Sequence, residues 1–228
     1  MCISVQRLLP YAVGSAIEAS SLEFCSRNPK AKHLGVELLP NQLISLGGSG
    51  LCFKDKNLIK AVTTGFAFPQ IFKFLANFKN GYESIVTLLR IQKILACKVD
   101  SPEKLALGLR AGIATTAAFA NYDPPSIELL SDFENDVIEF KVEKYDLSFF
   151  LCRLEGNLWK VNSSNPIERA SAILSFNSPL IATQAISGFF DHLAGVGLGH
   201  ASISGNIPLL DKIGYISRLV NRRLPSIL

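Results

Sequence analysis

The residues best suited to acid–base chemistry are Asp191, His192 and His200, which lie near the end of the 228-residue chain. A carboxylate next to an imidazole can move protons, but neighbours in sequence form a catalytic pair only when the fold points them at a common substrate. No nucleophile motif of the GxSxG type accompanies them, since residues 47–50 (GGSG) lack that spacing. We therefore expect no catalytic residues, and we predict that the protein is not an enzyme.

Glycines and cysteines could supply two other chemistries, cofactor binding and metal binding. Residues 195–199 (GVGLG) are rich in glycine, but they precede an expected strand, whereas a dinucleotide-binding loop follows a strand and opens a helix. The five cysteines form no CxxC pair and the chain has only three histidines, so we expect no metal site and no cofactor. An odd, scattered set of cysteines is typical of a reducing compartment, which predicts a cytoplasmic protein. The cysteines are Cys2, Cys25, Cys52, Cys97 and Cys152.

Charge is distributed unevenly over a chain that is otherwise rich in apolar residues. Hydrophobic residues make up 48% and charged residues 18%, which predicts a folded protein with a large core. Residues 51–110 hold ten Lys and Arg against four acids, and Arg218, Arg222 and Arg223 gather near the end. These basic residues could contact a membrane surface or a protein partner, or simply cover solvated helix faces. They form no dense run interleaved with aromatic residues, so we expect no nucleic-acid partner.

Two apolar segments match neither a signal peptide nor a membrane span. Residues 1–21 carry one early basic residue, Arg7, and Pro10 interrupts their short apolar run, which is a poor match to a signal peptide. Residues 170–190 are uncharged, but the polar and helix-breaking residues among them are typical of a strand, a turn and a helix.

Helical spacing dominates the first 120 residues. Apolar stripes predict helices over residues 57–78 (with a break at Pro69), 82–97 and 102–120. Ser101 and Pro102 are typical of an N-cap followed by the first helical residue. The helix after them is apolar on nearly every side, and a helix of this kind has to be buried. Short apolar runs over residues 34–54 favour a hairpin around the glycines at 47–50.

The pattern changes to strand-like alternation after residues 121–125 (NYDPP), the clearest boundary in the chain. Five short strands are predicted, over residues 137–143, 147–154, 158–161, 169–176 and 200–206. Helices are predicted over residues 178–190 and 208–223. We therefore expect an α+β protein, with a mainly helical region over 1–120 and a five-stranded antiparallel sheet covered by helices over 121–228.

The order of these elements resembles the sterol carrier protein type 2 superfamily of lipid-binding proteins. The matching parts are a strand at 172–176, a helix at 178–190 with Gly188 and Asp191 near its end, a strand at 199–206 ending in Gly-Asn, and the closing helix at 208–223. The resemblance runs from near residue 125 to the end of the chain. It implies that helices cover one face of a five-stranded antiparallel sheet and leave an apolar tunnel for a lipid. Ser202 and Ser204 stand where the family often has lysines.

The resemblance and the apolar faces that converge there together indicate a lipid tunnel between the sheet and its helices. Between Ala170 and Leu210 the only acidic or basic residue, histidines aside, is Asp191. A solid core would give the same pattern, so both interpretations stay open. The side chains expected to line the tunnel are Ile138, Phe140, Phe149, Leu151, Ile173, Ile186, Phe189, Phe190, Ile203, Leu210 and Ile213.

The sequence thus predicts non-catalytic binding, transfer or presentation of a hydrophobic lipid, such as a sterol, a fatty-acyl chain, a polyprenyl chain or a quinone precursor. Apolar area alone can supply the affinity, since each buried methylene contributes about 0.8 kcal/mol. The alternative is an interaction module that docks a protein partner through its basic, helical N-terminal region.

Overall fold

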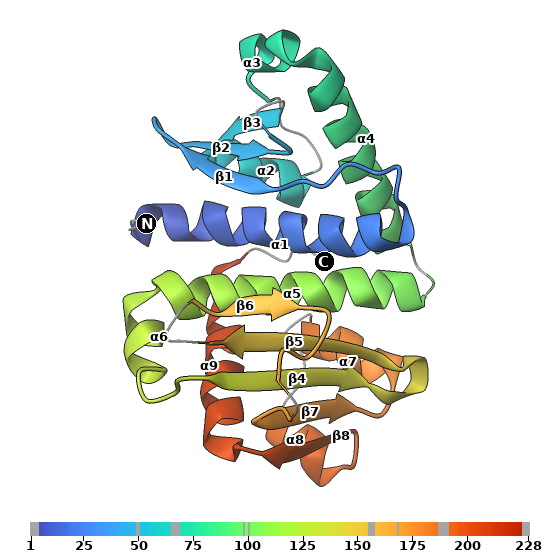
Figure 1. The fold of residues 1–228 in the computed structure, drawn as a ribbon, viewed down its shortest axis with the longest axis vertical. Helices are drawn as coiled ribbons and strands as arrows, with labels where there is room; N and C mark the ends of the chain where they lie inside the picture. Colours follow the sequence, from blue (N-terminus) through green and yellow to red (C-terminus); the bar gives the residue numbers. More distant parts are fainter. Residues whose placement is uncertain are drawn as a thin grey trace.

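Two long helices lie side by side across the middle of the computed structural model and separate two β-sheets (Figure 1). They are α1 (Val5–Arg27) and α5 (Pro102–Tyr122). A three-stranded sheet lies on the α1 side, and a five-stranded sheet lies on the α5 side. The structure describes residues 5–48, 51–64, 69–97, 99, 101–154, 158–167, 169–186 and 192–224.

The three-stranded sheet is an antiparallel meander of β1 (Val36–Leu39), β2 (Leu43–Leu46) and β3 (Leu51–Lys54). β2 and β3 confirm the expected hairpin, and β1 adds a third strand. The buried side chains of β2 and β3 pack against Val13 of α1 and Leu58 of the following helix. A region predicted to be mainly helical therefore contains a sheet of its own.

Three helices follow this sheet, α2 (Asp55–Thr64), α3 (Ile71–Ala76) and α4 (Phe78–Leu95). The predicted break at Pro69 is confirmed, because α2 ends at Thr64 and α3 begins at Ile71. Arg7 of α1 donates to Asp55 at the start of α2, with 2.9 Å between Nε and Oδ2. This ion pair ties α2 to the first turn of α1.

The helix α5 is buried along most of its length, as its all-round apolar character predicts. Its start is capped by Ser101, whose Oγ accepts a hydrogen bond from the backbone N–H of Lys104 at 3.1 Å. Leu107 packs against Phe24 of α1 and Ile91 of α4, whereas other faces of α5 belong to the core of the five-stranded sheet. The helix therefore serves as a wall shared by the two halves of the molecule.

The five-stranded sheet is mixed, which corrects the prediction of an antiparallel sheet. Its order is β6-β5-β4-β7-β8. The pairs β4–β5, β5–β6 and β7–β8 are antiparallel, but β4 and β7 run parallel. The strands are β4 (Asp136–Val142), β5 (Leu147–Arg153), β6 (Lys160–Asn162), β7 (Ala172–Phe176) and β8 (Ala201–Gly205).

The chain leaves the sheet after β6, which is an edge strand, and re-enters it as β7, on the side of β4 that faces away from β5. Strands β4 and β6 run in the same direction, because each is antiparallel to β5. The connection after β6 crosses back to the end of the sheet at which β6 begins, so β7 runs in that direction as well and is parallel to β4. Ser171 anchors the entry, since its N–H donates to the Val137 carbonyl at 2.8 Å. Ala170 packs with Val137, Phe150 and Cys152 on the outer face of the sheet.

Helices cover the other face of this sheet, and α7 and α9 lie behind it in Figure 1. They are α7 (Pro179–Ile186), α8 (His192–Gly197) and α9 (Ile207–Arg223), together with the short α6 (Pro124–Leu129) near the end of α5. The α8 helix occupies a stretch interpreted from the sequence as a glycine-rich loop. The side chain of Asn206 caps α9 by accepting from the N–H of Leu209 at 3.2 Å.

Candidate functional site

The covered face of the five-stranded sheet carries three cross-strand rows of apolar side chains, which we call the lower, middle and upper rows. Strand register defines them, because residues paired across neighbouring strands project from the same face. The lower row is Leu151, Ile138 and Ala172, the middle row is Phe149, Phe140, Leu174 and Ile203, and the upper row is Leu147, Val142, Phe176 and Ala201.

The middle row is incompletely covered at the centre of the sheet. Phe140 lies on β4, which has a hydrogen-bonded strand on each side, yet its side chain is only partly buried. Ile138 and Val142 occupy the same face of the same strand and are 0% exposed. A partly exposed side chain here means that space large enough for a water molecule lies against it. Phe140 is thus less well covered than the two residues that flank it on the same face of β4.

Other partly buried apolar side chains of the same cluster come from α7, α8, β8 and α9. Ile203 is in the middle row on β8, and Leu210 lies in the first half of α9. Ala185 of α7 and Val196 of α8 contact the same cluster. Half-buried apolar side chains of the cluster therefore come from α7, which precedes residues 187–191 in the sequence, and from α8, β8 and α9, which follow them.

Seven of the eleven side chains expected to line a tunnel belong to this cluster. Ile138, Phe149, Leu151 and Ile213 are buried, and Phe140, Ile203 and Leu210 are partly buried. Three expectations lie outside the described residues, namely the side chain of Ile186 and the residues Phe189 and Phe190.

Ile173 is the exception, because it projects from the outer face of β7. Ala172 and Leu174, its neighbours in sequence, are both in the cluster on the covered face, and side chains alternate along a strand. The alternation of Ser171, Ile173 and Ser175 with apolar residues was the signal for this orientation. The same alternation identifies Leu174 and Phe176 as members of the covered face that the sequence reasoning did not select.

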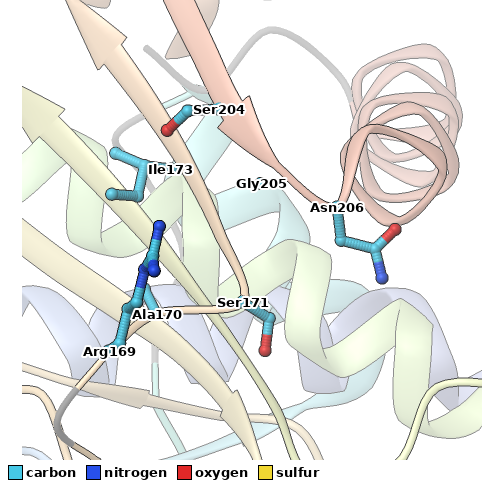
Figure 2. Close-up of a pocket in the computed structure, with 7 residues that line it drawn as sticks. All are labelled: Arg169, Ala170, Ser171, Ile173, Ser204, Gly205 and Asn206. Atoms are coloured by element: carbon cyan, nitrogen blue, oxygen red, sulfur yellow. The ribbon is translucent and has the colours of Figure 1, made fainter.

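Ile173 instead lines an open hollow of about 390 Å³ on the outer face (Figure 2). Arg169, Ala170, Ser171, Ser204, Gly205 and Asn206 are its other lining residues. The polar side chains of Ser171 and Asn206 are engaged with the backbone, accepting from the N–H groups of Val137 and Leu209. These two side chains hold β7 and α9 in place, so the hollow does not present them to a ligand.

The residues considered for acid–base chemistry do not assemble a described site. His200 is exposed, and its backbone N–H donates to the Gly195 carbonyl at 2.8 Å. Asp191 and the side chain of His192 lie outside the described residues. Among the residues that the structure describes, no three His, Cys, Asp or Glu side chains gather closely enough to hold a metal ion.

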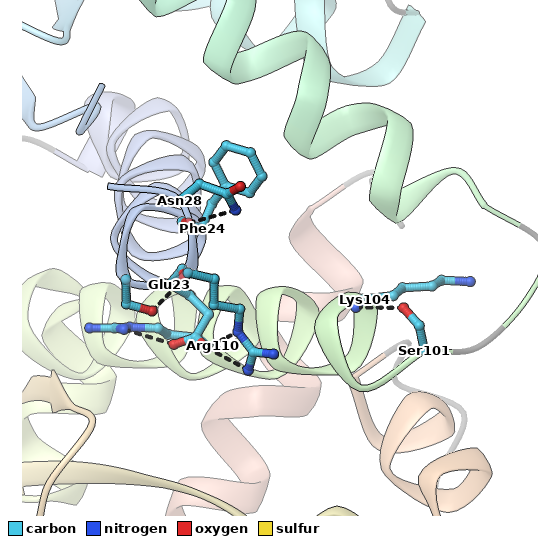
Figure 3. Close-up of polar contacts among 8 residues, drawn as sticks. Glu23, Phe24, Asn28, Ser101, Lys104 and Arg110 are labelled. Atoms are coloured by element: carbon cyan, nitrogen blue, oxygen red, sulfur yellow. Dashed lines mark hydrogen bonds and ion pairs between the residues drawn. The ribbon is translucent and has the colours of Figure 1, made fainter. Parts of the chain in front are cut away.

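A buried ion pair joins α1 to α5 (Figure 3). Arg110 of α5 donates to Glu23 of α1 with 3.1 Å between Nη1 and Oε2, and Arg27 binds the same carboxylate at 2.9 Å. The guanidinium of Arg110 also lies 5.8 Å from the ring centre of Phe149. Its Nε is buried and has no hydrogen-bond partner within the described part of the chain.

Of the three arginines near the end of α9, one forms an ion pair within the fold and the other two are exposed. Arg223 binds Asp123 at the start of α6 with 2.9 Å between Nη1 and Oδ1, and it lies over the ring of Phe119. Arg218 and Arg222 are exposed. Of the three residues proposed from the sequence as handles for a partner, Arg223 thus fastens the end of α9 to α6.

Burial also shifts the acidity of two groups near the cores. Desolvation, assisted by the neighbouring Tyr122, raises the pKa of Tyr11 from 10.0 to about 12, and the two rings meet edge to face at 5.3 Å. Desolvation raises the pKa of the Cys152 thiol to about 11, against a smaller opposing effect of Asn162. Cys152 is therefore a poor nucleophile at neutral pH.

No protein-family model matches this chain, and no curated protein sequence matches it either. Comparison with solved structures finds a similarity to a ubiquinone synthesis protein described as UbiJ-SCP2, at 14% identity and a TM-score of 0.40, over 50% of this chain and 96% of that one. A second similarity is to the sterol carrier protein domain 2 of Helicoverpa armigera, at 17% identity and a TM-score of 0.41, over 57% of this chain and 99% of that one. A third is to a double mutant of the sec-alkyl sulfatase PisA1, at 12% identity and a TM-score of 0.31, over 68% of this chain and 29% of that one.

Proposed function

We propose that this protein binds the hydrocarbon chain of a lipid against the middle row of the five-stranded sheet and carries or presents it without chemical change. The observation that supports this most directly is the partial exposure of Phe140 on the central strand β4, between Ile138 and Val142, which are fully buried on the same face. Ile203 and Leu210 supply further half-buried apolar surface to the same cluster. Binding and presentation require no nucleophile, metal ion or cofactor.

Apolar contact alone gives enough free energy for such binding. Each methylene removed from water contributes about 0.8 kcal/mol, so ten methylenes contribute about 8 kcal/mol before the costs of association and ordering. The ligand classes compatible with this are fatty-acyl and polyprenyl chains, sterols and quinone precursors. The odd number and scattered positions of the cysteines are typical of a reducing compartment, and on that ground we propose a cytoplasmic location.

The test compares two tryptophan substitutions at neighbouring positions of β8. Ile203→Trp places a large side chain on the covered face, whereas Ser202→Trp places the same side chain on the exposed outer face one residue away. We expect Ile203→Trp to weaken the binding of a fluorescent fatty acid about tenfold or more, and Ser202→Trp to leave it unchanged. Circular dichroism and thermal unfolding of both variants establish that each remains folded.

Native mass spectrometry of freshly purified protein provides the second readout, since a carrier retains a co-purified lipid that Ile203→Trp should displace. A protein without co-purified lipid and without saturable probe binding would refute the proposal. Equal binding by the two tryptophan variants would show that the ligand lies elsewhere.

A further inference from the structure

The helix α3 has an unusual composition for a helix on a protein surface. Five of its six residues (IFKFLA) are apolar, and none of the six is buried. Phe72 is 90% exposed, and Ile71 and Leu75 are each 61% exposed. A surface helix normally turns its apolar stripe toward the core and its polar face toward water. Here Phe74 packs on the core of the three-stranded sheet, whereas Ile71, Phe72 and Leu75 are exposed and are not covered by any element in the described part of the chain.

The exposed apolar surface continues into α4. Phe78 and Tyr82 are 57% and 58% exposed, and the two rings stack with their centres 6.3 Å apart. Phe78 also meets Phe74 of α3 edge to face at 5.6 Å, which braces α3 against α4. We call the five exposed side chains the apolar tip, and they are Ile71, Phe72, Leu75, Phe78 and Tyr82.

The charges beside the apolar tip are positive. Residues 71–82 contain Lys73 and Lys79 and no acidic residue. Arg90 and Lys93 follow on exposed positions of α4, against the single acid Glu83. Aliphatic and aromatic side chains bordered by lysines are typical of helices that lie in the interface of anionic membranes. None of the described helices is long and apolar enough to span a bilayer.

We propose that the apolar tip inserts into the surface of an anionic phospholipid membrane, with Lys73 and Lys79 contacting lipid phosphate groups. The position of α3 supports this occupant, because the helix forms one extremity of the molecule's longest axis (Figure 1). A projecting end can enter a bilayer surface without obstruction from the rest of the protein. The lysines complement the negative surface, and the exposed rings and aliphatic chains gain burial among the lipid tails.

Insertion at α3 would orient the whole molecule. The five-stranded sheet and α8 lie toward the opposite end of the long axis from α3 (Figure 1). The middle row would thus be held away from the bilayer, where a bound lipid could meet a second protein. Membrane docking at the apolar tip does not require the lipid site to exist, so the two proposals can be tested separately.

The experiment is sedimentation of the full chain with vesicles of phosphatidylcholine, with and without about one third phosphatidylglycerol. We expect binding to the anionic vesicles that weakens as salt is added. The double substitution Phe72→Ser, Leu75→Ser should reduce the apparent affinity for the anionic vesicles about tenfold or more. The matched control replaces Ile127→Ser and Tyr215→Ser, two exposed apolar side chains in the other half of the molecule, and should bind like the unmodified protein.

A fluorescence reporter locates the contact. The chain has one tryptophan, Trp159, which is buried, so Phe72→Trp adds a single exposed fluorophore at the apolar tip. We expect its emission to shift to the blue on anionic vesicles and to be quenched by brominated lipids, while Trp159 alone shows neither effect. The Lys73→Gln, Lys79→Gln pair should remove most of the salt dependence.

Two results would overturn membrane docking at the apolar tip. One is that the unmodified protein fails to sediment with anionic vesicles. The other is that the Phe72→Ser, Leu75→Ser variant binds as tightly as the control, as it would if the apolar tip served a protein partner. If every apolar-tip variant still binds the fluorescent fatty acid, the proposed lipid site is intact even when membrane docking at the apolar tip is refuted.

Discussion

Gly205 is the last residue of β8, and we predict that Gly205→Ala strongly destabilises the fold. Its φ of +83° lies in the left-handed region, which costs an alanine about 1 kcal/mol. A Cβ there would also collide with the carbonyl oxygen of Ser171 and lie 3.0 Å from Cα of Ala172. That carbonyl cannot move freely, because it accepts the N–H of Asn206 at 2.8 Å.

The expected loss is therefore about 3–5 kcal/mol. It combines the backbone conformation with about 1–3 kcal/mol for overpacking and about 1 kcal/mol for a weakened hydrogen bond. Gly199→Ala is the matched control, since Gly199 has a φ of +70° but no atom within 4 Å of the Cβ position. It should lose only about 1 kcal/mol.

Urea denaturation of the two variants measures the difference, which should be about 2–4 kcal/mol. Each kcal/mol lowers the melting temperature by about 2–4 °C in a chain of this size, so thermal unfolding gives an independent check. If the two alanine variants are equally stable, crowding at Ser171 does not determine the β8–α9 junction, and the reasoning is wrong.

Three further predictions follow from burial. Phe149→Ala should lose about 3–5 kcal/mol of stability, and Phe140→Ala in the same row less than half of that; equal losses would indicate a solid core. Arg110→Met should lose about 1.5–3 kcal/mol, since the buried Glu23 loses one charged hydrogen bond but keeps its ion pair with Arg27, and Glu23→Gln should cost less in the Arg110→Met background than alone, whereas additive losses would exclude this coupling. Because folding raises the pKa of Tyr11 from 10.0 to about 12, the free energy of unfolding should fall as the pH rises from 10 to 12, and this fall should be smaller in Tyr11→Phe.

Local signals in the sequence predicted several elements because the physics that forms them is local. Ser101 and Pro102 fixed the start of α5, and its all-round apolar composition required burial. Alternation over β4 likewise identified Ile138 and Phe140 as members of one face. These features depend on residues a few positions apart.

Long-range pairing was not accessible in the same way. No residue near β7 specifies which edge of the sheet the chain will join, so the parallel partnership with β4 was missed. The length of the connection from Lys160–Asn162 to Ala172 was a usable sign, since it exceeds that of a tight hairpin. The apolar tip was missed because its spacing of Ile71, Leu75 and Phe78 equals that of a buried helix.

The position of α5 between two cores has a consequence for synthesis on the ribosome. The helix emerges when only the elements of residues 5–97 are available to cover it, whereas Leu109 and Ile113 belong to a core whose other members include residues between Ile138 and Val220. At about 5–20 residues per second, those partners take roughly 5–20 s to appear. During that interval one apolar side of α5 is exposed. We expect nascent chains of this length to need a chaperone, and a released fragment ending after α5 to aggregate.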